Sequence, residues 1–126
     1  MTKIMIVEDE QDLREMLEIM LNKEGYQTDT AANGLELLKK IDIFQPDFVT
    51  LDIMMPGLTT SEILERLKDK KIKPKIILLT VVRYSEEEKQ KIYKMGNVVD
   101  YITKPFELDD LLNTIKKHVI KLDVSH

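Results

Sequence analysis

Short runs typical of β-strands alternate with helical periods along the whole chain, and this alternation constrains the fold more than any other feature. Apolar and β-branched residues favour strands over residues 4–7, 26–31, 47–52, 75–80 and 98–103. Every glycine and every proline falls between the elements, where neither residue interrupts a strand or a helix. A strand–helix unit repeated five times predicts an α/β fold, a doubly wound parallel sheet with helices on both faces.

Between the strand runs, apolar residues recur at the i, i+3, i+4 spacing of one helix face. The clearest stripe comprises Leu13, Met16, Leu17, Met20 and Leu21. Shorter stripes predict helices over residues 35–41, 63–67 and 108–119, and the spacing of Ser85 to Glu88 is that of a capping box opening a further helix. The runs 4–7, 47–52 and 75–80 are almost wholly apolar, which predicts central strands buried on both faces.

Length and composition limit the classes of protein to which the chain can belong. Its 126 residues suit one domain, residues 1–126, and the absence of cysteine excludes disulfides and thiolate metal sites. No signal peptide and no apolar run of about 20 residues is present, so we expect a cytoplasmic protein that binds no membrane. A net charge of -4 argues against a nucleic-acid-binding surface, and the lysine-rich residues 68–75 are interpreted as a solvated connection.

Polar side chains follow four of the five predicted strands at the point where each strand ends. Glu8 and Asp9 follow the first strand, Asp52 ends the third, Thr80 ends the fourth, and Lys104 follows the fifth. The carboxyl ends of parallel strands meet at one edge of the sheet, and ligands of such folds bind there. We therefore expect these five side chains to form one site.

The charges at this edge indicate what the site does. Two carboxylates 4 Å apart repel by about 1 kcal/mol in water and by about 4 kcal/mol at an effective dielectric constant of 20, so three acids together need a cation. Lys104 neutralises one charge, and Mg²⁺ retaining several waters suits the remaining oxygens better than Ca²⁺. Acids, metal, lysine and a hydroxyl together match phosphoryl transfer, in which Asp52 would become an aspartyl phosphate.

Four segments carry a resemblance to a known family. IVED (residues 6–9), LDIMMPG (51–57), LLT (78–80) and DYITKPF (100–106) occur in this order across the chain. With them the chain resembles the receiver domain of two-component response regulators, and it is similar to the single-domain chemotaxis regulators. The resemblance implies a five-stranded sheet of order 2-1-3-4-5 in a flavodoxin-like three-layer sandwich.

The resemblance also implies a role for each site residue. Asp52 would accept a phosphoryl group from the phosphohistidine of a sensor kinase, and Lys104 would pair with that group. Asp9 would bind Mg²⁺ directly and Glu8 through water, while Asp52 and the main-chain carbonyl of Met54 would complete the protein ligands. The domain would be a phosphoacceptor signalling module rather than an enzyme, limited to its own phosphorylation and dephosphorylation.

The resemblance further implies a switch and its partners. Thr80 and Tyr101 would be the switch pair, and Pro105 would follow a cis peptide bond. Phosphorylation would alter the face built from the fourth helix, fifth strand and fifth helix. The partners would be a sensor histidine kinase or phosphotransfer protein and a downstream protein or fused output domain; a phosphorylation-dependent homodimer is also compatible, although Thr114 replaces an arginine used in one dimer mode. The domain itself would bind no nucleic acid.

Several residues depart from the family pattern or stand outside it. Glu8 replaces the more frequent aspartate, and Val81 replaces a small residue directly after Thr80, where its branched side chain should narrow access to the phosphoryl group. The stretch from Thr80 to Lys104 is longer than usual by a residue within 81–84 and another within 96–101. Glu10 is interpreted as a first-turn helix carboxylate, and His118 has no partner that the sequence identifies.

Other functions of the same fold fit the residues less well. A nucleotide-binding site would need glycines or hydroxyls after the first strand, whereas three consecutive acids there would repel a phosphate. A phosphatase with an aspartate nucleophile would want an acid at Met54. A pseudo-receiver that binds proteins without phosphorylation stays open as an alternative; it would be expected to lack Asp9, Asp52 or Lys104, and all three are present.

Overall fold

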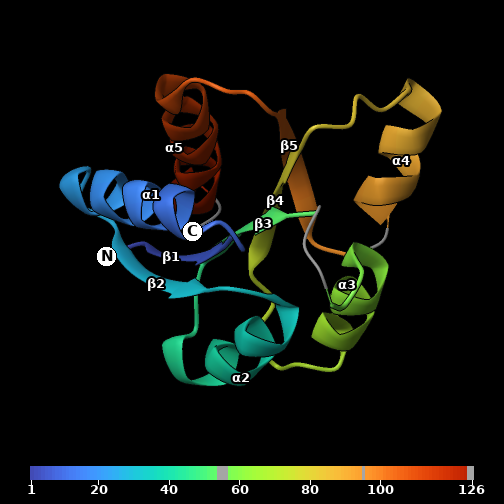
Figure 1. Ribbon diagram of the computed structural model, residues 1–126, viewed down its shortest axis with the longest axis horizontal. Coiled ribbons are helices and arrows are strands. Elements are labelled where there is room, and N and C mark those ends of the chain that lie inside the picture. Colours follow the sequence, from blue (N-terminus) through green and yellow to red (C-terminus); the bar gives the residue numbers. More distant parts are fainter. Residues whose placement is uncertain (54–56, 95, 125–126) are drawn as a thin grey trace.

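The computed structural model describes residues 1–53, 57–94 and 96–124, with side chains described as far as residue 119. Strands and helices alternate along the chain: β1 (Lys3–Val7), α1 (Gln11–Lys23), β2 (Gln27–Ala31), α2 (Gly34–Phe44), β3 (Phe48–Asp52), α3 (Thr60–Lys68), β4 (Lys75–Thr80), α4 (Glu86–Lys94), β5 (Val98–Thr103) and α5 (Leu108–Val124). The strands form one parallel sheet of order β2-β1-β3-β4-β5, which confirms the predicted fold class (Figure 1).

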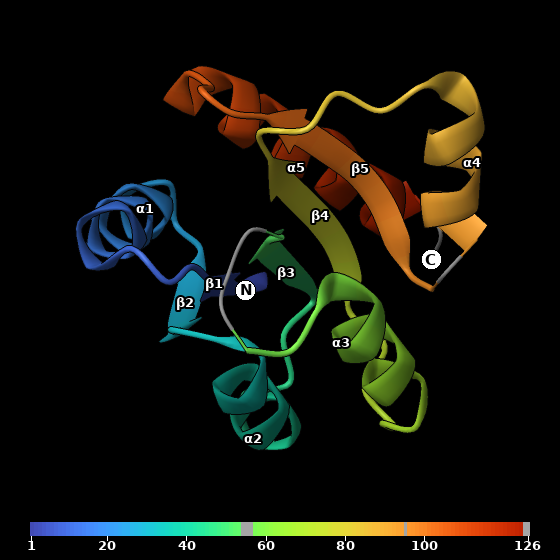
Figure 2. The same ribbon diagram turned by 45° about the vertical axis from the view of Figure 1, so that its right-hand side comes forward.

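The sheet lies between two layers of helices, as expected for a three-layer sandwich. Figures 1 and 2 show α1 and α5 on one side of the sheet and α2 and α3 on the other. α4 contributes Ile92 and Tyr93 to the core on the α2–α3 side. None of the helices described is both long and apolar enough to cross a lipid bilayer.

Burial follows the strand order. Every residue of β3 is buried, as are all residues of β1 and β4 except the first of each, whereas only the last residue of the edge strand β2 is buried. Alternate residues of the central strands enter opposite cores. Met5, Val49 and Leu78 pack on the α2–α3 side, and Ile4, Phe48 and Ile77 pack against α1 and α5. The almost wholly apolar runs are therefore the central strands, as predicted.

The helix ends show why the helices extend beyond the apolar stripes. The Ser85 hydroxyl accepts the N–H of Glu88 at 3.2 Å, and the Glu88 carboxylate accepts the N–H of Ser85 at 3.1 Å, which confirms the predicted capping box of α4. α1 ends at Lys23, and Gly25, two residues beyond it, has a φ of +92° in the left-handed region. The N–H groups of Gly25 and Tyr26 donate to the carbonyls of Asn22 and Leu21, forming a Schellman motif.

A β-bulge lies within residues 96–101, the stretch in which the sequence predicts one residue more than the family pattern. On β4, Ile76 is paired with Val98 and the next residue, Ile77, with Asp100, so Val99 has no partner in the ladder. A bulge absorbs one residue in one strand without shifting the rest of the sheet. The register beyond it is regular and pairs Thr80 with Thr103.

The packing of α2 on α3 makes a first prediction. A Cβ at Gly34 would lie 2.6 Å from Cδ1 and 2.7 Å from Cγ1 of Ile63. We expect Gly34→Ala to lower the free energy of unfolding by about 1–3 kcal/mol, measured by urea denaturation, because the methyl overpacks this contact. In an Ile63→Ala background the same substitution should lower the free energy of unfolding much less. Equal costs in the two backgrounds would show that this contact is not the cause.

Candidate functional site

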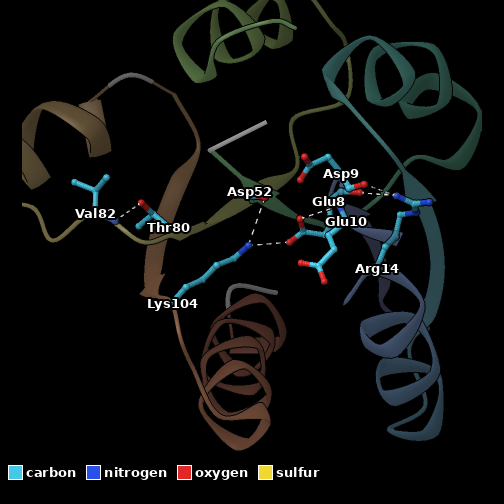
Figure 3. Close-up of polar contacts among 8 residues, drawn as sticks. All are labelled: Glu8, Asp9, Glu10, Arg14, Asp52, Thr80, Val82 and Lys104. Carbon is cyan, nitrogen blue, oxygen red and sulfur yellow. Dashed lines mark hydrogen bonds and ion pairs between the residues drawn. The ribbon is translucent and has the colours of Figure 1, made fainter. Parts of the chain in front are cut away.

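The five side chains predicted to share one edge of the sheet do lie there. Glu8 and Asp9 directly follow β1, Asp52 and Thr80 end β3 and β4, and Lys104 directly follows β5. Carboxylate oxygens of Glu8, Asp9 and Asp52 lie within 4.8 Å of one another. Glu8, Asp52 and Thr80 are buried, while Asp9 is exposed. Figure 3 shows the acids and Lys104 converging, whereas Thr80 contacts Val82.

Lys104 joins the two buried carboxylates. Its Nζ lies 2.9 Å from Oε1 of Glu8 and 3.4 Å from Oδ2 of Asp52, and its side chain is 19% exposed (Figure 3). The main-chain N–H of Lys104 donates to the carbonyl of Thr80 at 2.6 Å, which ties this residue to the end of β4. The peptide bond between Lys104 and Pro105 is cis, as expected.

The charges of this group perturb one another strongly. The pKa of Glu8 is raised to about 7, chiefly by burial and then by a hydrogen bond with Asp52, while the ammonium of Lys104 offsets part of the rise. Burial by itself would lower the pKa of Lys104, but its hydrogen bond to Glu8 and the charge of Asp52 outweigh burial and raise it. The site therefore favours a bound cation over two unpaired carboxylates.

Hydrogen bonds to the main chain fix the acidic turn between β1 and α1. Nη1 of Arg14 donates to the carbonyl of Glu8 at 2.8 Å and to that of Asp9 at 3.4 Å (Figure 3). The N–H of Glu8 donates to the carbonyl of Ala31 at 3.1 Å. Arg14 was not predicted as part of the site, because a single arginine in a predicted helix does not indicate which main-chain carbonyls it contacts.

Glu10 differs from its prediction. α1 begins at Gln11, so Glu10 is the residue before the helix, and its side chain makes no capping hydrogen bond. The acid of the first turn is Asp12. Glu10 instead donates its N–H to Oε2 of Glu8 at 3.3 Å, so its main chain rather than its carboxylate contributes to the turn.

The two residues of the predicted switch pair lie on neighbouring strands and contact the same loop. Oγ1 of Thr80 accepts the N–H of Val82 at 2.9 Å. Tyr101 is paired with Leu78 in the register of β4 and β5 and is half-buried against the core beside α4. Its ring contacts Tyr84, which lies in the same β4–α4 connection as Val82.

Met54 and His118, both considered from the sequence, differ in what the structure describes of them. Met54, whose main-chain carbonyl was predicted to bind the metal, lies outside the described residues. His118 does have a partner, since its Nε2 lies 3.1 Å from Oδ2 of Asp100 on β5 and its side chain is buried. That contact joins residues 18 positions apart, and no local pattern in the sequence could have indicated it.

An apolar hollow of about 440 Å³ adjoins the charged group. Its lining includes Leu13 and Met16 from α1, Val81 from the β4–α4 connection, and Lys104 with Phe106 beyond β5. Met16 is 45% exposed and Val81 is 57% exposed, so apolar surface reaches solvent beside the ammonium of Lys104. Val81 lines this hollow beside Lys104. The expectation that its side chain narrows access to the phosphoryl group stays a prediction.

Comparisons with known proteins agree with this geometry. The family model for the response regulator receiver domain matches residues 4–116. The chain is 37% identical over 117 residues to sporulation initiation phosphotransferase F of Bacillus subtilis, and the match covers 93% of each chain. It spans 42–50% of the length of six further curated relatives, which include transcriptional regulatory and sensory transduction proteins.

Solved structures of similar proteins include complexes with a metal and with a kinase. The response regulator protein TrrA of Thermotoga maritima in complex with Mg²⁺ and BeF is 40% identical and superposes with a TM-score of 0.75, covering 93% of this chain and 98% of TrrA. In a complex with the histidine kinase ThkA, TrrA is 39% identical with a TM-score of 0.76, covering 93% and 97%.

The raised pKa of Glu8 makes a second prediction. The folded protein binds this proton more tightly than the unfolded chain, whose ordinary glutamate pKa is 4.5, so stability falls as pH rises between 4.5 and about 7. Glu8→Gln carries no such proton. We expect the free energy of unfolding of the wild type to fall by about 2 kcal/mol relative to that of Glu8→Gln between pH 5 and pH 8. The measurement is urea denaturation in the absence of divalent ions.

The matched control for this measurement is Glu10→Gln, which alters a neighbouring exposed carboxylate. Its stability should follow that of wild type across the same pH range. A wild-type protein that gains stability relative to Glu8→Gln as the pH rises would contradict the assignment.

Proposed function

Since the chain belongs to the response regulator receiver domain family, we propose that it is a phosphorylation-dependent switch of a two-component phosphorelay and that Asp52 accepts the phosphoryl group. The observation that carries the proposal is the setting of Asp52. It ends a central strand, is buried, and has Nζ of Lys104 at 3.4 Å and the oxygens of two further acids within 4.8 Å.

The transfer follows from these positions. An oxygen of the Asp52 carboxylate attacks phosphorus, the bond between phosphorus and the donor's histidine nitrogen breaks, and the electron pair leaves with the imidazole. Lys104 is close enough to Asp52 to pair with an oxygen of the transferred group. The Thr80 hydroxyl accepts from Val82 and still has its own proton to donate to another oxygen.

The acids of the site suit a magnesium ion. Glu8, Asp9 and Asp52 supply oxygen atoms gathered within 4.8 Å, and oxygen is the donor that Mg²⁺ prefers. When bound, Mg²⁺ supplies positive charge to the phosphoryl oxygens during transfer. The exposed carboxylate of Asp9 suits direct ligation, whereas the carboxylate of Glu8 already contacts Lys104 and suits a ligand bound through water. The Met54 carbonyl remains a proposed further ligand.

The proposed conformational change begins when phosphorylation of Asp52 adds negative charge to the site. Phosphorylation adds about -1.5 to -2 units of charge beside Lys104. Thr80 then moves toward the phosphoryl group, the β4–α4 connection follows, and Tyr101 turns inward into the space that becomes free. No residue of α4 in the described segment 86–94 is buried, so this helix moves at low cost in core packing. The α4–β5–α5 face thereby presents a different surface.

The proposed partner that supplies the phosphoryl group is a sensor histidine kinase or a phosphotransfer protein. The complex of ThkA with TrrA supports this choice. The apolar hollow beside Lys104, with exposed Met16 and Val81, suits a protein surface that carries the phosphohistidine. The protein that donates the phosphoryl group would therefore bind on the α1 side of the site.

The remaining assignments concern the output. We propose a downstream protein or a fused output domain as the target of the α4–β5–α5 face, with residues 1–126 acting as one receiver domain and a phosphorylation-dependent homodimer as a further state. The domain itself would bind neither nucleic acid nor membrane. Its chemistry would be limited to its own phosphorylation and dephosphorylation, in the cytoplasm, where ATP is available to the kinase.

The third prediction tests the acceptor. With Mg²⁺ and beryllofluoride, a phosphoryl mimic, amide NMR spectra of the wild type should show shifts that include the α4–β5–α5 face. Asp52→Asn removes the anionic oxygen that the mimic needs, so no shift is expected. Asp29→Asn, an acid of the edge strand β2 paired with Lys40, is the matched control and should respond like wild type. The proposal fails if wild type gives no response or if Asp52→Asn gives the same one.

The fourth prediction separates the acids. Mg²⁺ titrations followed by amide NMR should show binding at least about tenfold weaker in Asp9→Asn, because a direct ligand is lost and even outer ligands are worth that much. Glu10→Gln should bind Mg²⁺ like wild type, since its carboxylate lies outside the cluster. An equal loss in the two variants would mean that general negative charge, not ligation by Asp9, attracts the ion.

A further inference from the structure

Two side chains outside the family motifs contact the ring of Tyr101. Tyr84, in the β4–α4 connection, packs edge to face against it, with ring centroids 5.9 Å apart and an interplanar angle of 76°. Lys89, in α4, has its Nζ 5.2 Å from the centroid of the same ring. Both contacts have the geometry of attractive aromatic interactions, an aromatic pair and a cation–π contact.

The ammonium of Lys89 also pairs with the carboxylate of Glu86. Nζ lies 3.1 Å from Oε1 of Glu86, one turn earlier in α4, and the Lys89 side chain is only 24% exposed. Hydrogen bonds to Tyr101 and to Glu86 raise the pKa of Lys89, so its charge is maintained at neutral pH. The cation is thus held at the ring by a carboxylate of its own helix.

These contacts carry much of the attachment of α4. Within the described residues of this helix no side chain is fully buried, and Ile92 and Tyr93 are the ones that pack partly against the core. Other helices bury leucine or isoleucine side chains completely, such as Leu17 and Leu21 of α1. For α4, contacts at the N-terminal half therefore depend on the polar and aromatic groups around Tyr101.

Both switch residues consequently hold the same segment. Oγ1 of Thr80 accepts the N–H of Val82, and Tyr101 contacts Tyr84 and Lys89. Residues 82–89 are thus attached to the end of β4 and to the middle of β5. A turn of the Tyr101 ring away from this position would break both of its contacts with that segment.

We propose that Lys89 and Tyr84 are positioning residues of the switch, which hold the Tyr101 ring against α4 and the β4–α4 connection until phosphorylation releases it. The proposal rests on the proposed function of Asp52 and on the inward turn of Tyr101, and it assigns the resting position of that ring to named contacts. A contact made in only one of two states stabilises that state alone, so removing it shifts the population toward the other.

The test compares two lysines of the same helix. Lys89→Met keeps a long unbranched side chain and removes the charge, and Lys91→Met makes the same change at an exposed position for which no aromatic contact is described. The first measurement is the NMR signal of the Tyr101 ring in the unphosphorylated protein, assigned by its absence in Tyr101→Phe. It should move in Lys89→Met and in Tyr84→Leu, and stay in Lys91→Met.

The second measurement is the apparent affinity for beryllofluoride with Mg²⁺. Loss of one cation–π contact should make binding about two- to fivefold tighter in Lys89→Met, with a similar gain in Tyr84→Leu and none in Lys91→Met. Unchanged or weaker binding in Lys89→Met, or a Tyr101 signal that does not move, would overturn the proposal.

The two measurements also separate this proposal from the proposed function. If wild type itself fails to bind beryllofluoride, the function of Asp52 is refuted and the release of Tyr101 by phosphorylation is refuted with it. If wild type binds and Lys89→Met binds equally, the receiver function stands and only the role of Lys89 and Tyr84 is overturned.

Discussion

The site depends on the ion pairs that the ammonium of Lys104 makes with the carboxylates of Glu8 and Asp52. Strands β1 and β3 are neighbours. The buried Glu8 directly follows β1 and the buried Asp52 ends β3, so the two carboxylates lie close together where water screens them little. Lys104 reaches them from β5, which is separated from β3 by β4. Adjacent strands lie about 4.8 Å apart, so only a long cationic side chain crosses that gap. β4 ends in the short, buried Thr80, which leaves room for it.

The same arrangement makes the three acids unequal. Glu8 has the longer stem and is buried, and it contacts Lys104 more closely than Asp52 does, at 2.9 Å against 3.4 Å. Burial and the nearby Asp52 then raise the pKa of Glu8 to about 7. Asp9, next in the chain, is exposed. One strand end therefore presents a carboxylate that is held inside the protein and another that is open to solvent, which is the basis for assigning them different roles toward a metal.

Most of the fold could be predicted because buried parallel strands are apolar on both faces. The predicted runs 75–80 and 98–103 coincide with β4 and β5, and the other strands differ by one residue at one end. The helices were shorter in prediction because their polar ends are formed by caps, as at Thr59, the N-cap of α3. Site residues at strand ends were predicted because topology alone brings them together. The contacts of Arg14 with the acidic turn and of His118 with Asp100 were not predicted, because the apolar pattern of a helix carries no information on the polar partners of its side chains.

The proposed route from the acids to the α4–β5–α5 face rests on a difference in packing. The sheet is rigid, since the central strands are buried on both faces, and a movement of Thr80 therefore cannot be absorbed by β4. The β4–α4 connection and α4 lack fully buried side chains in their described part and are held by a few directed contacts, from Thr80 to Val82 and from Tyr101 to Tyr84 and Lys89. In the proposed switch, a small displacement of Thr80 would therefore act on a helix that buries no side chain in its described part, and this helix belongs to the proposed partner face.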